Sequence, residues 1–212
     1  MSITPKLHGY SIQEKIYTGS RTIVYRAMCG LEQKPVVIKL MQNEYPSFSE
    51  IVQFRNQYTI AKNLNIPGII KLYSLEAYQN GYALVMEDFG GISLKEWFKN
   101  TESVNLPSLQ DFLVVAIQIA TIIDELHRNH IIHKDIKPAN ILINPETKQI
   151  KIIDFSISSL LPKETQQLQN PNVLEGTLAY ISPEQTGRMN RGIDYRIAEC
   201  YFGSIETSSL YW

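Results

Sequence analysis

Up to Gly90, most apolar residues occur in short runs rich in β-branched and aromatic types, the pattern typical of strands. The runs fall at Tyr10–Tyr17, Thr22–Cys29, Val36–Met41, Ile69–Tyr78 and Tyr82–Glu87. From Ser47 to Asn65 the apolar residues are spaced three or four apart until Pro67-Gly68, which predicts one helix. Asn80-Gly81 favours positive φ at both centres of a type I′ turn and predicts a hairpin. We therefore expect a small antiparallel sheet with one helix.

After Gly90 the pattern changes to that of a long helix. Apolar residues recur at helical spacing from Ser108 to Asn129, and Asp111 three residues after Ser108 suits a capped start where the helix dipole favours negative charge. The turn residues Asn144-Pro145 separate two further apolar runs. These runs predict a second small hairpin, formed by Ile141–Ile143 and Ile150–Ile153.

Composition narrows the class of protein without changing this picture. With 44% hydrophobic and 19% charged residues among 212, the chain matches a packed globular protein. A net charge of -1 provides no basic field, so we expect neither nucleic acid nor a membrane as a partner. The most apolar stretch, Val114–Ile123, is shorter than the roughly 20 residues that span a bilayer. The two cysteines, Cys29 and Cys200, lie far apart, which argues against a disulfide framework and favours a cytoplasmic setting.

Four short motifs carry candidate chemistry. Lys39 ends an apolar strand, where its charge is costly unless it meets an anion, although a lysine that reaches back to solvent is the ordinary alternative. The stretch His133–Asn140 holds a carboxylate, two lysines and an amide, which suffice for a base, a charge neutraliser and a metal ligand. Asp154, followed by Phe155-Ser156, can present a carboxylate to Mg²⁺, although an Asp at a strand end is common. The stretch Gly176–Glu184 closes a polar loop.

Together these motifs resemble the signature set of the eukaryotic-type protein kinases over Tyr10–Arg196. Lys137 and Thr177 are similar to residues of the serine/threonine branch, in which the threonine helps to position the catalytic Asp and Lys. The resemblance implies an α+β, bilobal kinase-like fold over residues 1–196, with a small antiparallel-sheet lobe at 10–89 and an incomplete, mainly helical lobe at 90–196. The run Glu184–Arg191 resembles the kinase domain that begins large bacterial signalling proteins, whose later signalling modules are missing from this chain.

The resemblance also implies that the chain uses ATP and Mg²⁺ and acts on serine or threonine hydroxyls of a protein substrate. Lys39 would hold the α- and β-phosphates, Asp135 would accept the proton of the substrate hydroxyl, and Lys137 would neutralise charge on the γ-phosphate. Asn140 and Asp154 would bind Mg²⁺. Adenine would lie among Ile16, Val24, Val37, Met86 and Leu142, with hydrogen bonds from the backbone of Glu87 and Phe89.

Several positions depart from the family pattern. Of the three glycines in the phosphate-binding loop only the middle one, Gly19, is kept. Gln57 stands where an active kinase usually has the glutamate that pairs with the strand lysine, so its amide can hydrogen-bond Lys39 but supplies no charge. Two further departures are Ser156 in place of a glycine and Lys134 in place of the arginine that reads activation-loop phosphorylation.

The last residues, 197–212, differ most from the family. The family continues there into a buried helix that opens with an aspartate, and this chain has Ala198 at that position. We expect this tail to be poorly ordered and the larger lobe to be truncated. Three interpretations stay open: a serine/threonine kinase, an ATP-binding or docking module without turnover, and an inactive gene fragment.

Overall fold

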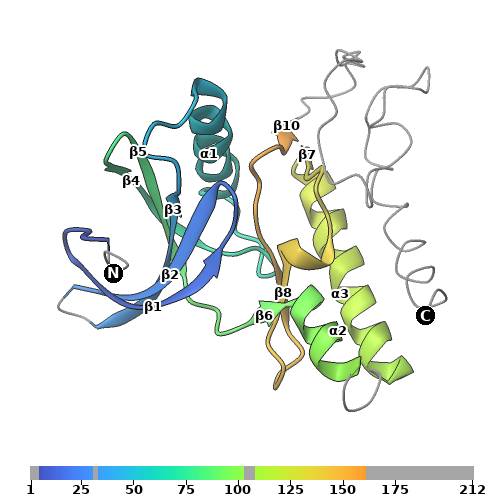
Figure 1. The fold of residues 1–212 in the computed structure, drawn as a ribbon. Helices are drawn as coiled ribbons and strands as arrows, with labels where there is room; N and C mark the ends of the chain where they lie inside the picture. Colours follow the sequence, from blue (N-terminus) through green and yellow to red (C-terminus); the bar gives the residue numbers. More distant parts are fainter. Residues whose placement is uncertain (1–4, 31–32, 103–107, 161–212) are drawn as a thin grey trace. The chain divides into compact units, whose positions relative to one another are not determined.

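The computed structural model describes residues 5–30, 33–102 and 108–160 (Figure 1). The chain divides into two compact units, one formed by Met1–Leu64 with Ile70–Gly90 and the other by Asn65–Ile69 with Gly91–Trp212. We call the first the sheet unit and the second the helical unit. No helix in the described ranges is long and apolar enough to cross a membrane.

The sheet unit is built on one antiparallel five-stranded sheet. Its elements are β1 Tyr10–Thr18, β2 Thr22–Cys29, β3 Lys34–Met41, α1 Phe48–Ala61, β4 Leu72–Tyr78 and β5 Gly81–Glu87. The strand order is β1-β2-β3-β5-β4, so β3 lies between β2 and β5. All five predicted strands are confirmed, but β4 begins at Leu72 and not at Ile69. Ile69 belongs to the helical unit, where it forms a parallel bridge with Ile152.

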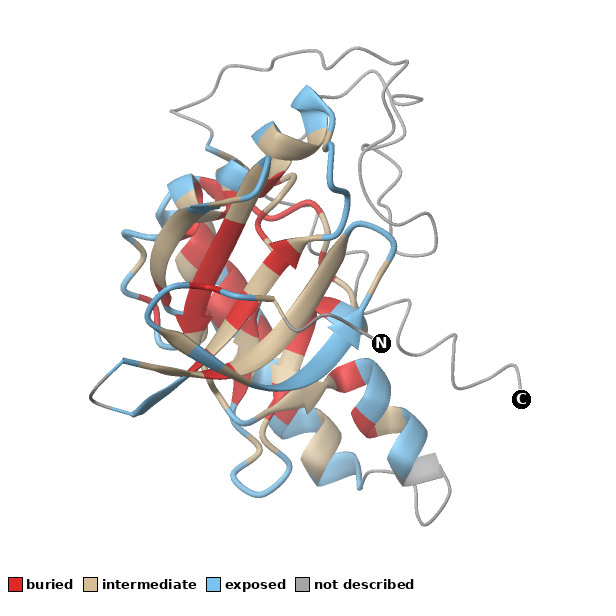
Figure 2. Cartoon of the chain, turned by 60° about the vertical axis from the view of Figure 1, so that its left-hand side comes forward, coloured by how far each residue is buried: buried red, intermediate tan, exposed pale blue. Residues whose placement is uncertain are grey.

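Alternation along the strands gives this sheet two different faces. One face carries the apolar core of the unit, and the central strands are accordingly red in Figure 2. The core consists of Leu7, Ala27, Val36, Ile38, Leu40, Ala83 and Val85. Val37 and Lys39 alternate with the core residues of β3, so they point to the other face.

Helix α1 begins at a capping box. Ser47 Oγ accepts the Glu50 N–H at 3.3 Å, and Glu50 Oε2 accepts the Ser47 N–H at 2.8 Å, which satisfies two backbone donors that the helix leaves open. The predicted end at Asn65 is wrong, because the Leu64 N–H turns back to the Ala61 carbonyl at 3.1 Å and the helix stops at Ala61. Its buried face consists of Phe54, Gln57, Ile60 and Ala61.

The hairpin between β4 and β5 turns differently from the prediction. Its loop consists of Gln79 and Asn80, and positive φ occurs at Gln79 (51°) but at neither Asn80 nor Gly81. The Asn80 amide donates to the Glu44 carbonyl at 3.0 Å, and a Cβ at Gly81 would lie 2.9 Å from the Met41 sulfur. The predicted type I′ turn at Asn80-Gly81 is therefore wrong. Close contacts with neighbouring segments, and not φ, account for these two residues.

Over the residues that the structure describes, the helical unit combines two α-helices with short paired strands. Its elements are β6 Ile92–Ser93, α2 Leu94–Glu102, α3 Leu109–Arg128, β7 Ile131–Ile132, the 3-10 helix η1 Pro138–Asn140, β8 Ile141–Ile143, β9 Ile150–Ile152 and β10 Ser159–Leu160. The predicted long helix is confirmed, with Ser108 Oγ accepting the Asp111 N–H at 3.1 Å. The predicted β8–β9 hairpin is also confirmed. Helix α2 was not predicted.

The β8–β9 hairpin is anchored to α3 by one glutamine. Gln118 Nε2 donates to the Lys148 carbonyl at 2.8 Å, and Gln118 Oε1 accepts the Ile150 N–H at 3.2 Å. Asn140 immediately precedes β8, and Asp154 follows β9. The hairpin therefore fixes the backbone between two of the predicted site residues.

Candidate active site

In the sheet unit, the strand lysine is held against α1. Lys39 Nζ donates to Gln57 Oε1 at 2.9 Å, and Gln57 is only 5% exposed. The amide oxygen accepts an ammonium proton without adding negative charge. The contact expected from the sequence spacing is present, and it fixes the direction of the lysine within this unit.

Cross-strand pairs place most of the predicted adenine residues on the same sheet face as Lys39. Val24 of β2 lies opposite Lys39, and Val37 of β3 lies opposite Met86 of β5. Directly opposite residues of an antiparallel pair point to one face, so these four side chains share it. Ile16 is 42% exposed and falls at a register shift of β1, where it has no paired residue.

Two acidic side chains hold the backbone that follows β5. Glu87 Oε1 accepts the Lys71 N–H at 2.6 Å, and the Glu87 N–H donates to the Lys71 carbonyl at 2.9 Å. Asp88 Oδ1 accepts the Gly90 N–H at 3.0 Å, and Asp88 Oδ2 accepts Arg26 Nε at 2.6 Å. Because the Glu87 N–H is used inside the unit, a hydrogen bond from Glu87 to adenine can involve only its carbonyl oxygen.

The turn between β1 and β2 keeps Gly19 under an aromatic ring. The Gly19 N–H donates to the Thr22 carbonyl at 2.9 Å, which closes the turn. A Cβ at this position would lie 2.6 Å from the hydroxyl of Tyr17, whose side chain is 58% exposed. A larger residue would therefore have to displace the tyrosine ring.

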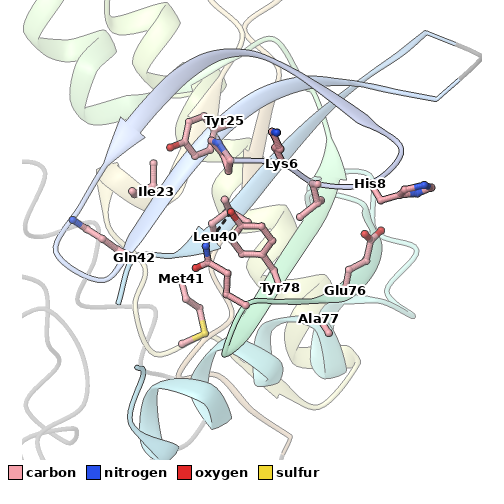
Figure 3. Close-up of a pocket in the computed structure, with 13 residues that line it drawn as sticks. Lys6, His8, Ile23, Tyr25, Leu40, Met41, Gln42, Glu76, Ala77 and Tyr78 are labelled. Atoms are coloured by element: carbon pink, nitrogen blue, oxygen red, sulfur yellow. Dashed lines mark hydrogen bonds between the residues drawn. The ribbon is translucent and has the colours of Figure 1, made fainter. Parts of the chain in front are cut away.

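A pocket of about 730 Å³ lies on the opposite face of the sheet (Figure 3). Leu40, which lines it, alternates along β3 with Lys39 and so points away from the lysine. At its edge Glu76 accepts the Tyr10 hydroxyl at 2.7 Å, and burial together with this bond raises the pKa of Tyr10 to about 12. None of the residues predicted to bind ATP lines this pocket.

In the helical unit, two predicted site residues converge on one carboxylate oxygen. Asp135 Oδ2 accepts Lys137 Nζ at 2.6 Å and Asn140 Nδ2 at 2.9 Å. Asn140 Nδ2 also donates to the Asp135 carbonyl at 2.9 Å, which ties the loop to itself. The side chains of Asp135 and Lys137 are 12% and 21% exposed, so the ion pair is largely removed from water. A carboxylate oriented beside a cation suits a base that works next to an anion.

A buried histidine supports this loop. His133 Nε2 donates to the Ile153 carbonyl at 3.0 Å, and the Asp135 N–H donates to His133 Nδ1 at 3.3 Å. These two bonds require the neutral imidazole with its proton on Nε2. Burial lowers the pKa of His133 below 6.5, which favours the same neutral form. The ring also packs edge-on against Phe155 at 4.7 Å between centroids, so it joins the loop to the residue after Asp154.

The two predicted metal ligands are brought together by the backbone. The Ile153 N–H, one residue before Asp154, donates to the Asn140 carbonyl at 2.9 Å. Both side-chain bonds of Asn140 use Nδ2, so its amide oxygen is the side-chain atom suited to a cation. Mg²⁺ prefers oxygen ligands and commonly takes one or two from the protein and the rest from phosphates and water. The pair Asn140 and Asp154 therefore fits a Mg²⁺ that is bound together with a nucleotide.

Some predicted residues lie elsewhere in the chain. Leu142 lies on β8 in the helical unit, opposite Ser93 and Lys151. Thr177 lies outside the described residues, as do the stretch 176–184 and the tail 197–212.

Two contacts that support the site were not predicted from the sequence. Ser158 Oγ donates to the His133 carbonyl at 2.9 Å, and Arg26 pairs with Asp88 although the two are 62 positions apart. No local pattern marks either contact. The strand order, which places β2 and β5 on either side of β3, is the feature that makes the second contact possible.

Comparison with known families agrees with this arrangement. The model of the protein kinase domain matches residues 10–197, which is most of the chain. The chain therefore belongs to the protein kinase domain family.

Curated bacterial proteins are similar over most of this chain. A probable serine/threonine-protein kinase of Clostridium acetobutylicum is 32% identical over 83% of this chain and 26% of its own length. The serine/threonine-protein kinase PrkC of Bacillus subtilis is 33% identical over 87% of this chain and 28% of its own length. PknA of Mycobacterium tuberculosis is 33% identical over 83% of this chain and 41% of its own length. The chain thus spans between a quarter and about two-fifths of these relatives.

Proposed function

We propose that this chain is the kinase domain of a serine/threonine protein kinase and transfers the γ-phosphoryl group of ATP to protein hydroxyls. The observation that carries the proposal is the convergence of Lys137 and Asn140 on one oxygen of Asp135, in a loop joined by hydrogen bonds to the segment of Asp154. The names of the bacterial relatives support the same activity and the same class of substrate.

Each residue has one role in the proposed reaction. Asp135 orients a serine or threonine hydroxyl and accepts its proton as the oxygen bonds to the γ-phosphorus and the bond to the β-phosphate oxygen breaks, releasing ADP. Lys137 neutralises negative charge on the transferred group, and Lys39 binds the α- and β-phosphates. Asn140 and Asp154 would hold Mg²⁺, which supplies charge neutralisation on the phosphates when bound.

The base of ATP would bind to the sheet face that carries Val24, Val37 and Met86. A contact of Leu142 with the base stays a prediction from the sequence. The carbonyl of Glu87 and the backbone of Phe89 would supply directional hydrogen bonds. Thr177 would help to position Asp135 and Lys137. A cytoplasmic location and additional signalling modules stay predictions from the sequence.

No observation on the described residues favours a module that binds ATP without turnover. Gln57, the departure that suggested it, still bonds Lys39.

The test is transfer of labelled phosphoryl groups from γ-labelled Mg·ATP to a mixture of unstructured proteins. Asp135→Asn removes the base and keeps the size of the side chain, and we expect its rate to fall by about a hundredfold or more. Asp124→Asn is the matched control, because Asp124 is exposed on α3 and forms its salt bridge with Arg128 of the same helix. Full activity of Asp135→Asn, or equal loss in both variants, would contradict the proposal.

A further inference from the structure

An ion-pair network crosses the sheet unit beside the predicted adenine residues. Arg26 Nε donates to Asp88 Oδ2 at 2.6 Å, and a second guanidinium nitrogen of Arg26 contacts Glu14 Oε1. The Asp88 side chain is only 10% exposed, whereas those of Arg26 and Glu14 are 37% and 55% exposed. The Asp88 contact is therefore the less solvated arm of the network, where a charged hydrogen bond is stronger.

The register shows which face this network occupies. Glu14, Arg26, Val37 and Met86 are consecutive cross-strand partners, so they form one row on the face that also carries Lys39. Because β3 lies between β2 and the end of β5, Arg26 must reach over β3 to meet Asp88. Two strand spacings are roughly 10 Å, which the arginine and aspartate side chains together can span. The arginine stem therefore crosses the sheet beside Val37, a predicted adenine contact.

The backbone on both sides of Asp88 is also held by hydrogen bonds. The other oxygen of Asp88 accepts the Gly90 N–H at 3.0 Å, and the neighbouring Glu87 is bonded twice to Lys71. The segment from Glu87 to Gly90 is thus held to Lys71, just before β4, by one carboxylate and to Arg26 of β2 by the next. This segment contains the backbone groups that the proposed function assigns to adenine.

We infer that Arg26 is a positioning residue for the nucleotide base: through Asp88 it holds the backbone of residues 87–90 in the conformation that binds adenine. The inference rests on the proposed function and adds a residue to it. Arg26 affects only the binding of the base, so loss of the Arg26–Asp88 pair lowers the affinity for ATP and for adenosine by the same factor. Lys39, which acts on phosphates, affects ATP alone.

The test is calorimetric titration of the 212-residue chain with Mg·ATP and with adenosine. Arg26→Met keeps the unbranched stem and removes the charge, and we expect the dissociation constants of both ligands to rise by about fivefold to tenfold with unchanged stoichiometry. Asp88→Asn, which keeps the shape of the side chain, should have a similar effect. In the double variant the loss should not exceed that of the worse single variant, because both remove one interaction.

Controls separate this role from general destabilisation. Lys15→Met removes an exposed cation from the same sheet, and Glu14→Gln removes the exposed arm of the network; both should bind the two ligands within about twofold of the wild type. A variant that is partly unfolded lowers the binding stoichiometry and not the affinity of the folded fraction.

The outcomes distinguish the two proposals. If Arg26→Met and Asp88→Asn bind both ligands as the wild type does, the inference is wrong and the proposed function stands. If Arg26→Met weakens ATP alone, Arg26 contacts the phosphates and the positioning role is also wrong. Wild-type protein that binds neither ligand would overturn the proposed function, and the inference with it.

Discussion

At the scale of single residues, Gln57 is the departure from the kinase pattern with the clearest physical consequence. It keeps the hydrogen bond to Lys39 at 2.9 Å and is itself buried in α1. An uncharged acceptor holds an ammonium group less strongly than a carboxylate does. The lysine is therefore oriented by geometry, with a smaller electrostatic contribution from this partner.

Two substitutions of Gln57 should have different effects on the rate of phosphoryl transfer. Gln57→Leu removes the acceptor and should lower kcat/KM for ATP about tenfold, the value of one hydrogen bond to a charged group. Gln57→Glu has the same shape and adds charge, so its kcat/KM should equal or exceed that of the wild type. Steady-state kinetics at varied ATP measure both. Wild-type activity in Gln57→Leu would show that the contact does not position Lys39.

A second prediction at this scale concerns His133. Its pKa in the folded protein is lowered by burial, so below about pH 6.5 the unfolded chain binds a proton that the folded chain does not. The free energy of unfolding should therefore fall as the pH decreases from 6.5, by up to about 1.4 kcal/mol per pH unit for this histidine. Burial also lowers the pKa of His127, which acts in the same direction.

Urea unfolding between about pH 7 and pH 5.5 measures this slope before most carboxylates protonate. His133→Asn should flatten it, and His127→Gln should do so separately. If the free energy of unfolding of the wild type stayed constant or rose as the pH is lowered over this range, the assignment of a neutral His133 with its proton on Nε2 would be contradicted.

At the scale of elements, helices and strands could be predicted where the local sequence pattern was strong and could not be predicted where it was weak. The strands of the sheet follow from short runs of β-branched and aromatic residues, and the start of α3 follows from a capping serine; both signals act within a few residues. Helix α2 was missed because only Leu94 and Trp97 are buried among its residues with described burial, and one pair of apolar residues three apart does not define a helical period. The β4–β5 turn was mispredicted because the glycine at position 81 is explained by its close approach to the Met41 side chain. No local sequence pattern reveals this contact.

The capping box of α1 gives a prediction for this scale. Ser47→Ala removes the oxygen that accepts the Glu50 N–H, and it should lower the free energy of unfolding by about 1 kcal/mol. Ser49→Ala is the matched control, because Ser49 is exposed within the same helix and alanine favours helix there. Urea denaturation of the two variants measures the difference. Equal stability of both would mean that the cap does not hold the helix that carries Gln57.

At the scale of the whole molecule, the sequence motifs predicted the family and many of the local contacts. The contact of Lys39 with Gln57 follows from counting along a helix. The contact of Arg26 with Asp88 depends on a strand order that places β3 between β2 and β5, and this order is a property of the complete sheet. Residues such as Thr177 lie outside the described residues, so their roles stay predictions.

The central claim is that Asp135 and its partners transfer a phosphoryl group from bound ATP. The most direct measurement is a single turnover, with the chain in excess over γ-labelled Mg·ATP and a protein acceptor present, followed by identification of the labelled amino acid. We expect label on serine and threonine. We also expect an Asp135→Asn variant to bind the same amount of ATP and to transfer its γ-phosphoryl group slower by about a hundredfold or more. ATP that stays bound and intact in the wild type would contradict the account and identify a module that binds nucleotide without turnover.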